Sequence, residues 1–323
     1  RRYPGVYWTH NDSGGKPEVF ALTVDGSDLG SYAFPGAKAV DWEDIGIGPK
    51  RGASGSYIYA ADIGDNAALL PVAGRGRVRD FVTVYRAPEP AVAPKAPGSP
   101  LTGVEHFNLI YPGGPEDAET LIVDPISGDL VIVTKSLIGS SRILVAPAAS
   151  LSNGATITMR EVGTIHIVAP AGAASKFPGT LVTGGDISSD GSLILLRTYA
   201  AVLAFARAPG QSVPDALLGV ACNAPQVSED QGEAIAIAAD TSRYVTISEG
   251  ASPPVNVFPI APAAARSATT VSTATTRART AVGARHAAPA GNNAERGAVA
   301  AVLLLAVLLA VRRLRVSSRS SAG

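Results

Sequence analysis

Four carboxylates recur at matching places along this sequence, each near the start of a short apolar run. They are Glu43, Glu119, Asp186 and Glu233, in the runs Trp42–Ile47, Ala118–Val123, Gly185–Ser188 and Gly232–Ile237. Carboxylates that converge within a few ångströms repel one another, so they either bind a cation or raise one another's pKa. Oxygen ligands alone favour Ca²⁺ or Mg²⁺ over zinc, which prefers histidine or cysteine. If the fold brings the four acids together, they predict a Ca²⁺ or Mg²⁺ site.

A second set of polar residues stands at the sixth place of another series of apolar runs. Its members are Asn11, Asp62, Lys135, Arg197 and Glu249. Equivalent positions in repeated units share the same surroundings, so we expect these residues to line a polar channel or its mouth. The two cations of this set either orient an anionic group or neutralise the acids. A structural interpretation also stays open, in which the acids cap loops and pair with Lys135 or Arg197.

The elements that would position both sets are short strands. Up to about residue 260, apolar runs such as Tyr57–Asp62 and Leu130–Thr134 are separated by Gly, Pro, Asp and Asn, which is typical of strands joined by turns. The runs recur at roughly 50 to 75 residues with about four strands per unit, as in a β-propeller. We predict an all-β propeller over residues 1–260, with five or six four-stranded blades. The first blade is expected to be truncated, because the sequence starts shortly before Val6.

Charge and cysteine content exclude two classes of protein. The 323-residue chain has 27 Lys and Arg and 27 Asp and Glu, so no net charge is available to attract nucleic acid. Cys222 is the one cysteine in the sequence, which excludes an intramolecular disulfide scaffold. The 34 Gly and 24 Pro favour short strands and turns over long helices.

The composition changes after the predicted propeller. Residues 261–296 are rich in Ala, Ser, Thr and Arg with almost no aliphatic bulk, so we predict a disordered linker. Residues 297–316 begin with an uncharged apolar run, which predicts a short transmembrane helix. The arginines that follow this run favour a cytoplasmic tail over 317–323 and a propeller on the outer side of the membrane.

Two groups of motifs resemble known propellers. The stretch from Tyr7-Trp8-Thr9 to Asp25-Gly26 is similar to one blade of the YWTD propellers of receptor ectodomains. A broader set resembles a group of uncharacterised, mostly secreted bacterial propellers: His10–Gly14, Asp41–Ile45, Ala61–Asn66, Asp117–Glu119, Thr183–Ile187 and Gly232–Ala234. That group is distantly similar to gluconolactonase-like and NHL propellers, so the resemblance implies the fold and an exported location without an agreed activity. Gluconolactonase-like propellers hold a divalent metal in the channel with Glu, Asn and Asp, and the resemblance would extend that metal site to the four acids.

Two hypotheses about function follow. The first is a binding or scaffold module, displayed outside the cell by the linker and the membrane helix, whose partner is an unidentified protein or small molecule. The alternative is a metal-dependent hydrolase of the lactonase type, in which the acids hold the ion and Glu233 or Asp186 acts as general base. An ion with open coordination positions beneath a cleft would favour the hydrolase, whereas a binding module needs only a shaped rim.

Overall fold

The computed structural model describes residues 3–12, 14–50, 52–69, 78–92, 96–169 and 176–261. The predicted linker beyond residue 261, the predicted membrane helix and the tail lie outside these ranges. Within them, no helix is both long and apolar enough to cross a membrane.

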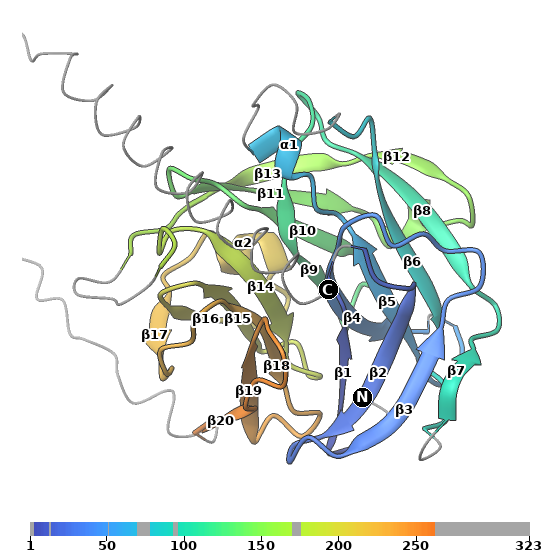
Figure 1. The fold of residues 1–323 in the computed structure, drawn as a ribbon. Helices are drawn as coiled ribbons and strands as arrows, with labels where there is room; N and C mark the ends of the chain where they lie inside the picture. Colours follow the sequence, from blue (N-terminus) through green and yellow to red (C-terminus); the bar gives the residue numbers. More distant parts are fainter. Residues whose placement is uncertain are drawn as a thin grey trace, which may run out of the picture. The chain divides into compact units, whose positions relative to one another are not determined.

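Five sheets follow one another around a common centre, as the blades of a propeller do (Figure 1). The all-β propeller is confirmed, and the number of blades is five, the lower of the two numbers predicted. Short runs of β-branched and aromatic residues, each ended by a Gly, Asp or Pro turn, explain why the chain forms many short strands here. Each sheet buries its faces against its neighbours in shared hydrophobic clusters.

The strands are grouped as follows, from the centre outward. Blade 1 holds β1 (Val6–His10), β2 (Glu18–Thr23), β3 (Asp28–Ala33) and β7 (Ala96–Pro100). Blade 2 holds β4 (Trp42–Pro49), β5 (Ser56–Asp62), β6 (Val82–Pro88), β8 (Glu105–Ile110) and β12 (Thr156–Thr158). Blade 3 holds β9 (Ala118–Val123), β10 (Leu130–Thr134), β11 (Ser140–Ala146) and β13 (Arg160–His166). Blade 4 holds β14 (Val182–Ile187), β15 (Leu193–Thr198), β16 (Val202–Ala206) and β17 (Cys222–Ala224). Blade 5 holds β18 (Gly232–Ile237), β19 (Arg243–Ser248) and β20 (Asn256–Pro259).

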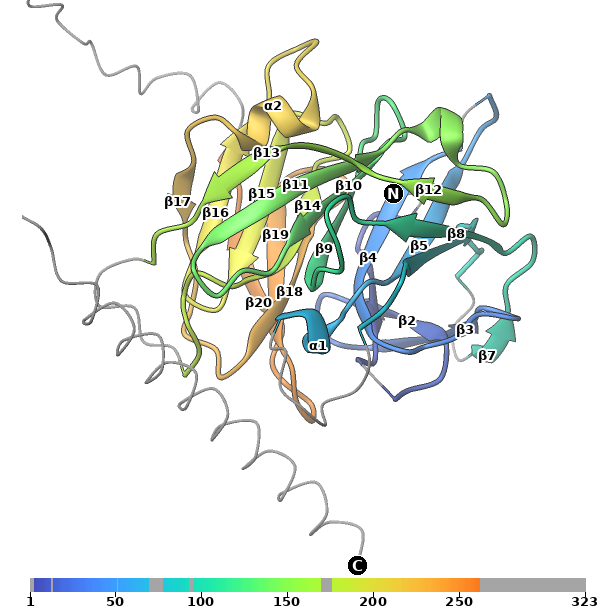
Figure 2. The same cartoon turned by 90° about the horizontal axis from the view of Figure 1, so that it is seen from above.

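The blades differ in their outermost strands. Neighbouring strands pair antiparallel except at two outer edges, where β7 runs parallel to β3 and β12 runs parallel to β8 (Figure 2). Blade 2 therefore has five strands, one more than predicted, and three strands of blade 5 lie within the described residues. The described helices are single turns in the connections: α1 (Asn66–Leu69), the 3₁₀ turn Ala148–Ser150 and α2 (Val213–Leu217).

The hydrophobic core lies between the blades. Between blades 2 and 3, for example, Phe107 packs in the same buried cluster as Leu121. The inner strands also approach closely, because a Cβ on Gly46 of β4 would lie 2.6 Å from a methyl carbon of Val123 on β9. The cluster that joins blades 5 and 1 is the smallest of those described, with only Tyr7, Ala238 and Val245 buried in it.

Candidate functional site

A β-bulge at the start of each complete inner strand sets the candidate site. In β4, β9, β14 and β18 the pairing with the second strand skips one residue near the strand start, and the skipped residues are Glu43, Glu119, Thr183 and Glu233. A bulge residue is left out of the ladder, and bulges often re-aim a side chain next to active sites. Three of the four predicted acids therefore occupy equivalent bulge positions, as the sequence repeat indicated.

Asp186 is the acid that the structure does not bring to this position. It stands three residues beyond Thr183, and its carboxylate accepts hydrogen bonds from the N–H groups of Ile187 and Ile237, both at 2.7 Å. Asp44 is bonded in the same way to the next blade, because it accepts from the N–H of Leu121 at 2.7 Å. Each of these two acids thus links neighbouring inner strands. The sequence comparison matched Asp186 with the glutamates because the start of β14 contains no acidic residue, and Thr183 holds the position equivalent to theirs.

A chain of polar contacts connects the glutamates of blades 3 and 5. The ammonium of Lys135 donates to Glu119, and it also lies 3.4 Å from the hydroxyl oxygen of Tyr199. Tyr199 in turn donates to Glu233 Oε1 at 2.9 Å. Lys135 and Glu119 are both buried, and the second carboxylate oxygen of Glu119 is buried with no hydrogen-bond partner among the described residues. The Glu119–Lys135 pair agrees with the structural interpretation offered for the acids.

Burial and mutual repulsion raise the pKa values of these carboxyl groups. Burial raises the pKa of Glu119 to about 7 although Lys135 opposes the change, and burial together with Glu119 raises the pKa of Glu233 to about 8. Burial, then Glu119, raises the pKa of Glu43 well above its usual range. Burial by itself would lower the pKa of Lys135, but the surrounding carboxylates outweigh it and raise this pKa. Lys135 therefore keeps its charge at neutral pH. Groups perturbed in this way often mark functional sites.

The residues predicted to line a channel separate into two groups. Lys135 and Glu249 each come directly after the end of the second strand of their blades, and Tyr199 holds the equivalent place in blade 4. Gln231 joins Glu249 to the network, because its side-chain amide donates to Glu249 and, at 3.2 Å, to Glu233. Asn11 lies beyond the end of β1 and lines the cavity described below.

Asp62 and Arg197 have other partners. Asp62 is buried, forms an ion pair of 2.9 Å with Arg79 and accepts from the N–H of Asp41. Arg197 is buried between blades 4 and 5, where it pairs with Glu229 at 2.5 Å and donates to a main-chain carbonyl of β18. Arg197 therefore joins two blades, and it pairs with an acid that the sequence comparison did not single out.

A group of three carboxylates near blade 2 escaped the sequence-based prediction. One oxygen from each of Asp12, Asp41 and Glu43 lies within 4.8 Å of the others. Gly64 makes this possible, because a Cβ there would lie 2.5 Å from Asp41 Oδ2 and closer still to Glu43. Burial, followed by the charges of Asp12 and Asp117, raises the pKa of Asp41 to about 6. Asp12 and Asp41 belong to two of the motifs that resemble bacterial propellers, His10–Gly14 and Asp41–Ile45. Only the fold shows that these two residues lie close together.

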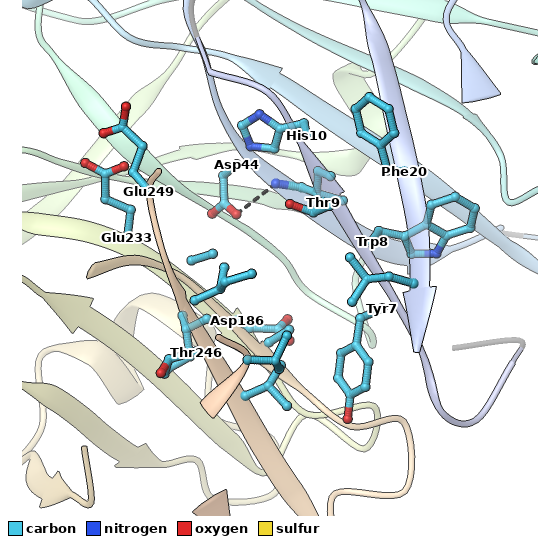
Figure 3. A pocket seen from close by; sticks show the side chains of 18 of the residues that line it. Tyr7, Trp8, Thr9, His10, Phe20, Asp44, Asp186, Glu233, Thr246 and Glu249 are labelled. Carbon is cyan, nitrogen blue, oxygen red and sulfur yellow. Dashed lines mark hydrogen bonds between the residues drawn. The ribbon is translucent and has the colours of Figure 1, made fainter. Parts of the chain in front are cut away.

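A cavity of about 640 Å³ opens between blades 5 and 1 (Figure 3). In Figure 3, Glu233 and Glu249 lie together at one end, and Tyr7 lies at the other. Asp12 and Glu43 also line the cavity, so the acidic network opens into it. The rest of the lining is largely apolar, and it includes Phe20, Ile47, Ile235, Val245 and both tryptophans of the sequence, Trp8 and Trp42.

Comparisons with known proteins give distant likenesses. No protein-family model matches the chain, and no curated protein does so. Among solved structures, the chain is similar to the periplasmic gluconolactonase of Pseudomonas aeruginosa, with 13% identity and a TM-score of 0.38, over 80% of this chain and 69% of that chain. It is also similar to a candidate 6-phosphogluconolactonase of Bacteroides fragilis NCTC 9343, with 14% identity and a TM-score of 0.36, over 79% of this chain and 64% of that chain. At this distance the assignment of the fold rests on the strand pairing described above.

Proposed function

We propose that the protein is a hydrolase of small cyclic esters, the lactonase type of reaction, and that it works at the acidic end of the cavity. One observation carries the proposal: bulge glutamates from three blades meet a buried lysine where a ligand-sized cavity opens. A concave apolar site with a few convergent polar groups of perturbed pKa is the usual form of an active site. Opening a lactone needs a base for the attacking water and positive charge near the carbonyl oxygen.

Glu233 is the residue we assign as general base. It lines the cavity, whereas Glu119, Lys135 and Tyr199 do not. A pKa of about 8 places its carboxyl close to the range where a base accepts a proton and returns it efficiently. Tyr199 holds one oxygen of Glu233 at 2.9 Å, and Lys135 holds Tyr199 and Glu119 together. These three are positioning residues, since they act on the substrate only through Glu233.

A divalent cation would fit best at Asp12, Asp41 and Glu43. Their oxygens converge within 4.8 Å, and carboxylate oxygens are the ligands that Ca²⁺ and Mg²⁺ prefer. Of the acids predicted as ligands, Glu43 belongs to this group, while Glu119 is paired with Lys135 and Asp186 is bonded to main-chain N–H groups. A cation bound there would polarise the substrate carbonyl.

The test is hydrolysis of a panel of five- and six-membered lactones by the full chain, with Ca²⁺, Mg²⁺ or Mn²⁺ added in turn. We expect Glu233→Gln to lower kcat by about 10²-fold or more while cation binding is kept. Glu43→Gln should weaken cation binding and activity together, because it removes one of the three converging carboxylates. Glu161→Gln, which changes an exposed glutamate of β13, is the matched control and should leave both unchanged. No hydrolysis above background with any of the ions, or full activity in Glu233→Gln, would rule the proposal out.

The membrane anchor stays a separate proposal. The apolar run within residues 297–316 and the arginines after it support a single-pass helix with the propeller outside the cytoplasm. Removing residues 297–323 should release the protein from membranes without changing its thermal stability. If the shortened protein still sediments with membranes after a salt wash, this segment is not the sole anchor.

A further inference from the structure

Glu249 stands next to Glu233 at the acidic end of the cavity (Figure 3). The side-chain amide of Gln231 donates to one carboxylate oxygen of each glutamate, at 3.2 Å in the case of Glu233 Oε1. The main chain fixes the position of Glu249, because its N–H donates to the carbonyl oxygen of Gln231 at 2.8 Å. Two carboxyl groups from neighbouring strands of blade 5 are therefore held together by a third side chain.

The two carboxyl groups differ in their contact with solvent. Glu233 is half-buried, and the hydroxyl group of Tyr199 donates to its Oε1 at 2.9 Å, whereas Glu249 is exposed. Burial, then the charge of Asp12, raises the pKa of Glu249. Lys135 and a hydrogen bond with Glu233 oppose this change. A proton on Glu233 therefore has a direct path to a carboxylate that touches solvent.

Hydrolysis of a lactone at neutral pH leaves one proton in the site at each turnover. In the proposed reaction Glu233 takes a proton from the attacking water, the water oxygen bonds to the carbonyl carbon, and the ring C–O bond breaks. The proton on Glu233 then passes to the leaving ring oxygen, which becomes the hydroxyl group of the product. The new carboxylic acid has an ordinary pKa of about 4, so its own proton moves to Glu233, whose pKa is about 8. Glu233 must lose this proton before it can act again.

Direct loss of the proton from Glu233 to water is slow. A proton recombines with a carboxylate no faster than diffusion allows, about 10¹⁰ M⁻¹s⁻¹, so a group with a pKa of about 8 releases its proton at about 10² s⁻¹. This rate lies within the usual range of kcat, roughly 1 to 10³ s⁻¹. A second carboxylate that accepts the proton from Glu233 removes this limit on turnover.

We propose that Glu249 is the proton relay of the site: it accepts the proton from Glu233 after each turnover and delivers it to solvent. Gln231 is a positioning residue, since it holds the two carboxyl groups within reach of each other. This inference rests on the proposed hydrolase function and adds the route by which the proton leaves. Because Glu249 is exposed, it exchanges protons with dissolved buffer as well as with water.

The test compares wild type with Glu249→Gln on the lactone that wild type hydrolyses fastest, in weakly buffered solution and with excess imidazole. In weak buffer we expect Glu249→Gln to lower kcat at least about fivefold with KM unchanged. Imidazole should restore kcat to within about twofold of wild type, since a small base can take the proton from Glu233 instead. Loss of the charge of Glu249 by itself lowers the pKa of Glu233 and speeds direct proton loss, so this charge effect does not explain a slower variant.

Two further variants and the wild-type protein supply the controls. Glu249→His keeps a proton carrier at this place and should retain at least about half of the wild-type kcat in weak buffer. Glu161→Gln, which changes an exposed glutamate of β13, should match wild type in both solutions. The relay is overturned, and the hydrolase is left standing, if Glu249→Gln is as fast as wild type in weak buffer or is not restored by imidazole. A wild-type kcat that itself rises with imidazole overturns the relay in the same way and needs no variant that folds. No hydrolysis of any lactone by wild type overturns the hydrolase and the relay together.

Discussion

Neutralising Glu233 should change how the stability of the propeller depends on pH. Its pKa is raised from 4.5 to about 8, so the folded state binds this proton more tightly than the unfolded state does. Below pH 4.5 the group is protonated in both states and contributes nothing. As pH rises towards 8, the folded state loses up to about 5 kcal/mol relative to the unfolded state. Glu119 shares this coupling, and solvent in the cavity screens part of it.

Glu233→Gln removes the charge and keeps the oxygen that accepts from Tyr199. We therefore expect the variant to be more stable than wild type by at least about 1 kcal/mol at pH 9, and to match it at pH 4.5. The assay is urea unfolding at several pH values in the presence of chelator, followed by tryptophan fluorescence. Glu161→Gln on the exposed edge of β13 controls for the loss of one negative charge, since Arg142, which pairs with Glu161 at 2.7 Å, keeps its second partner Glu116. Stability curves of Glu233→Gln and wild type that run parallel from pH 4.5 to 9 would refute the reasoning.

Two further predictions concern single contacts. Arg197→Met should lower the free energy of unfolding by about 3 to 5 kcal/mol, because it leaves Glu229 buried without the partner that lies 2.5 Å away. Adding Glu229→Gln should recover part of this loss in urea unfolding, and a loss below about 1 kcal/mol in Arg197→Met would contradict the buried pairing. Gly64→Ala should weaken Ca²⁺ binding about tenfold or more, because the Cβ of the new alanine enters the space of the Asp41 and Glu43 carboxylates. If calorimetry gives the wild-type affinity for this variant, the cation binds elsewhere.

Most of the strands and three of the acids could be predicted from the sequence, because local patterns encode them. Leu130–Thr134 is a strand as predicted, since alternation and β-branched residues need no long-range information. The prediction failed at Asp186, because the start of β14, Val182–Gly185, contains two glycines, no aliphatic run and no acid, and Thr183 holds the position equivalent to the three glutamates.

Contacts between distant segments could not be predicted in this way. Asp12 and Asp41 meet because blades 1 and 2 are neighbours, and no local spacing relates the two residues. Arg197 stands in the same sequence pattern as Lys135, yet it points between two blades and pairs with Glu229 instead of joining the network. The outer strand β7 is rich in Pro and Gly, so its sequence is typical of a loop and does not predict a strand.

Because of the repeated bulge, the strand pairing of each inner strand does not depend on which side chain its skipped residue carries. Glu43, Glu119, Thr183 and Glu233 stand outside the ladder, so a new side chain at any of them leaves the main-chain hydrogen bonds of its blade in place. Blade 4 already carries a neutral residue there, and Thr183 donates to the carbonyl of Gly232 at 3.0 Å. An evolving or engineered propeller of this kind can therefore exchange charge and proton affinity at these positions without breaking the strand pairing, provided that Lys135 keeps a carboxylate partner.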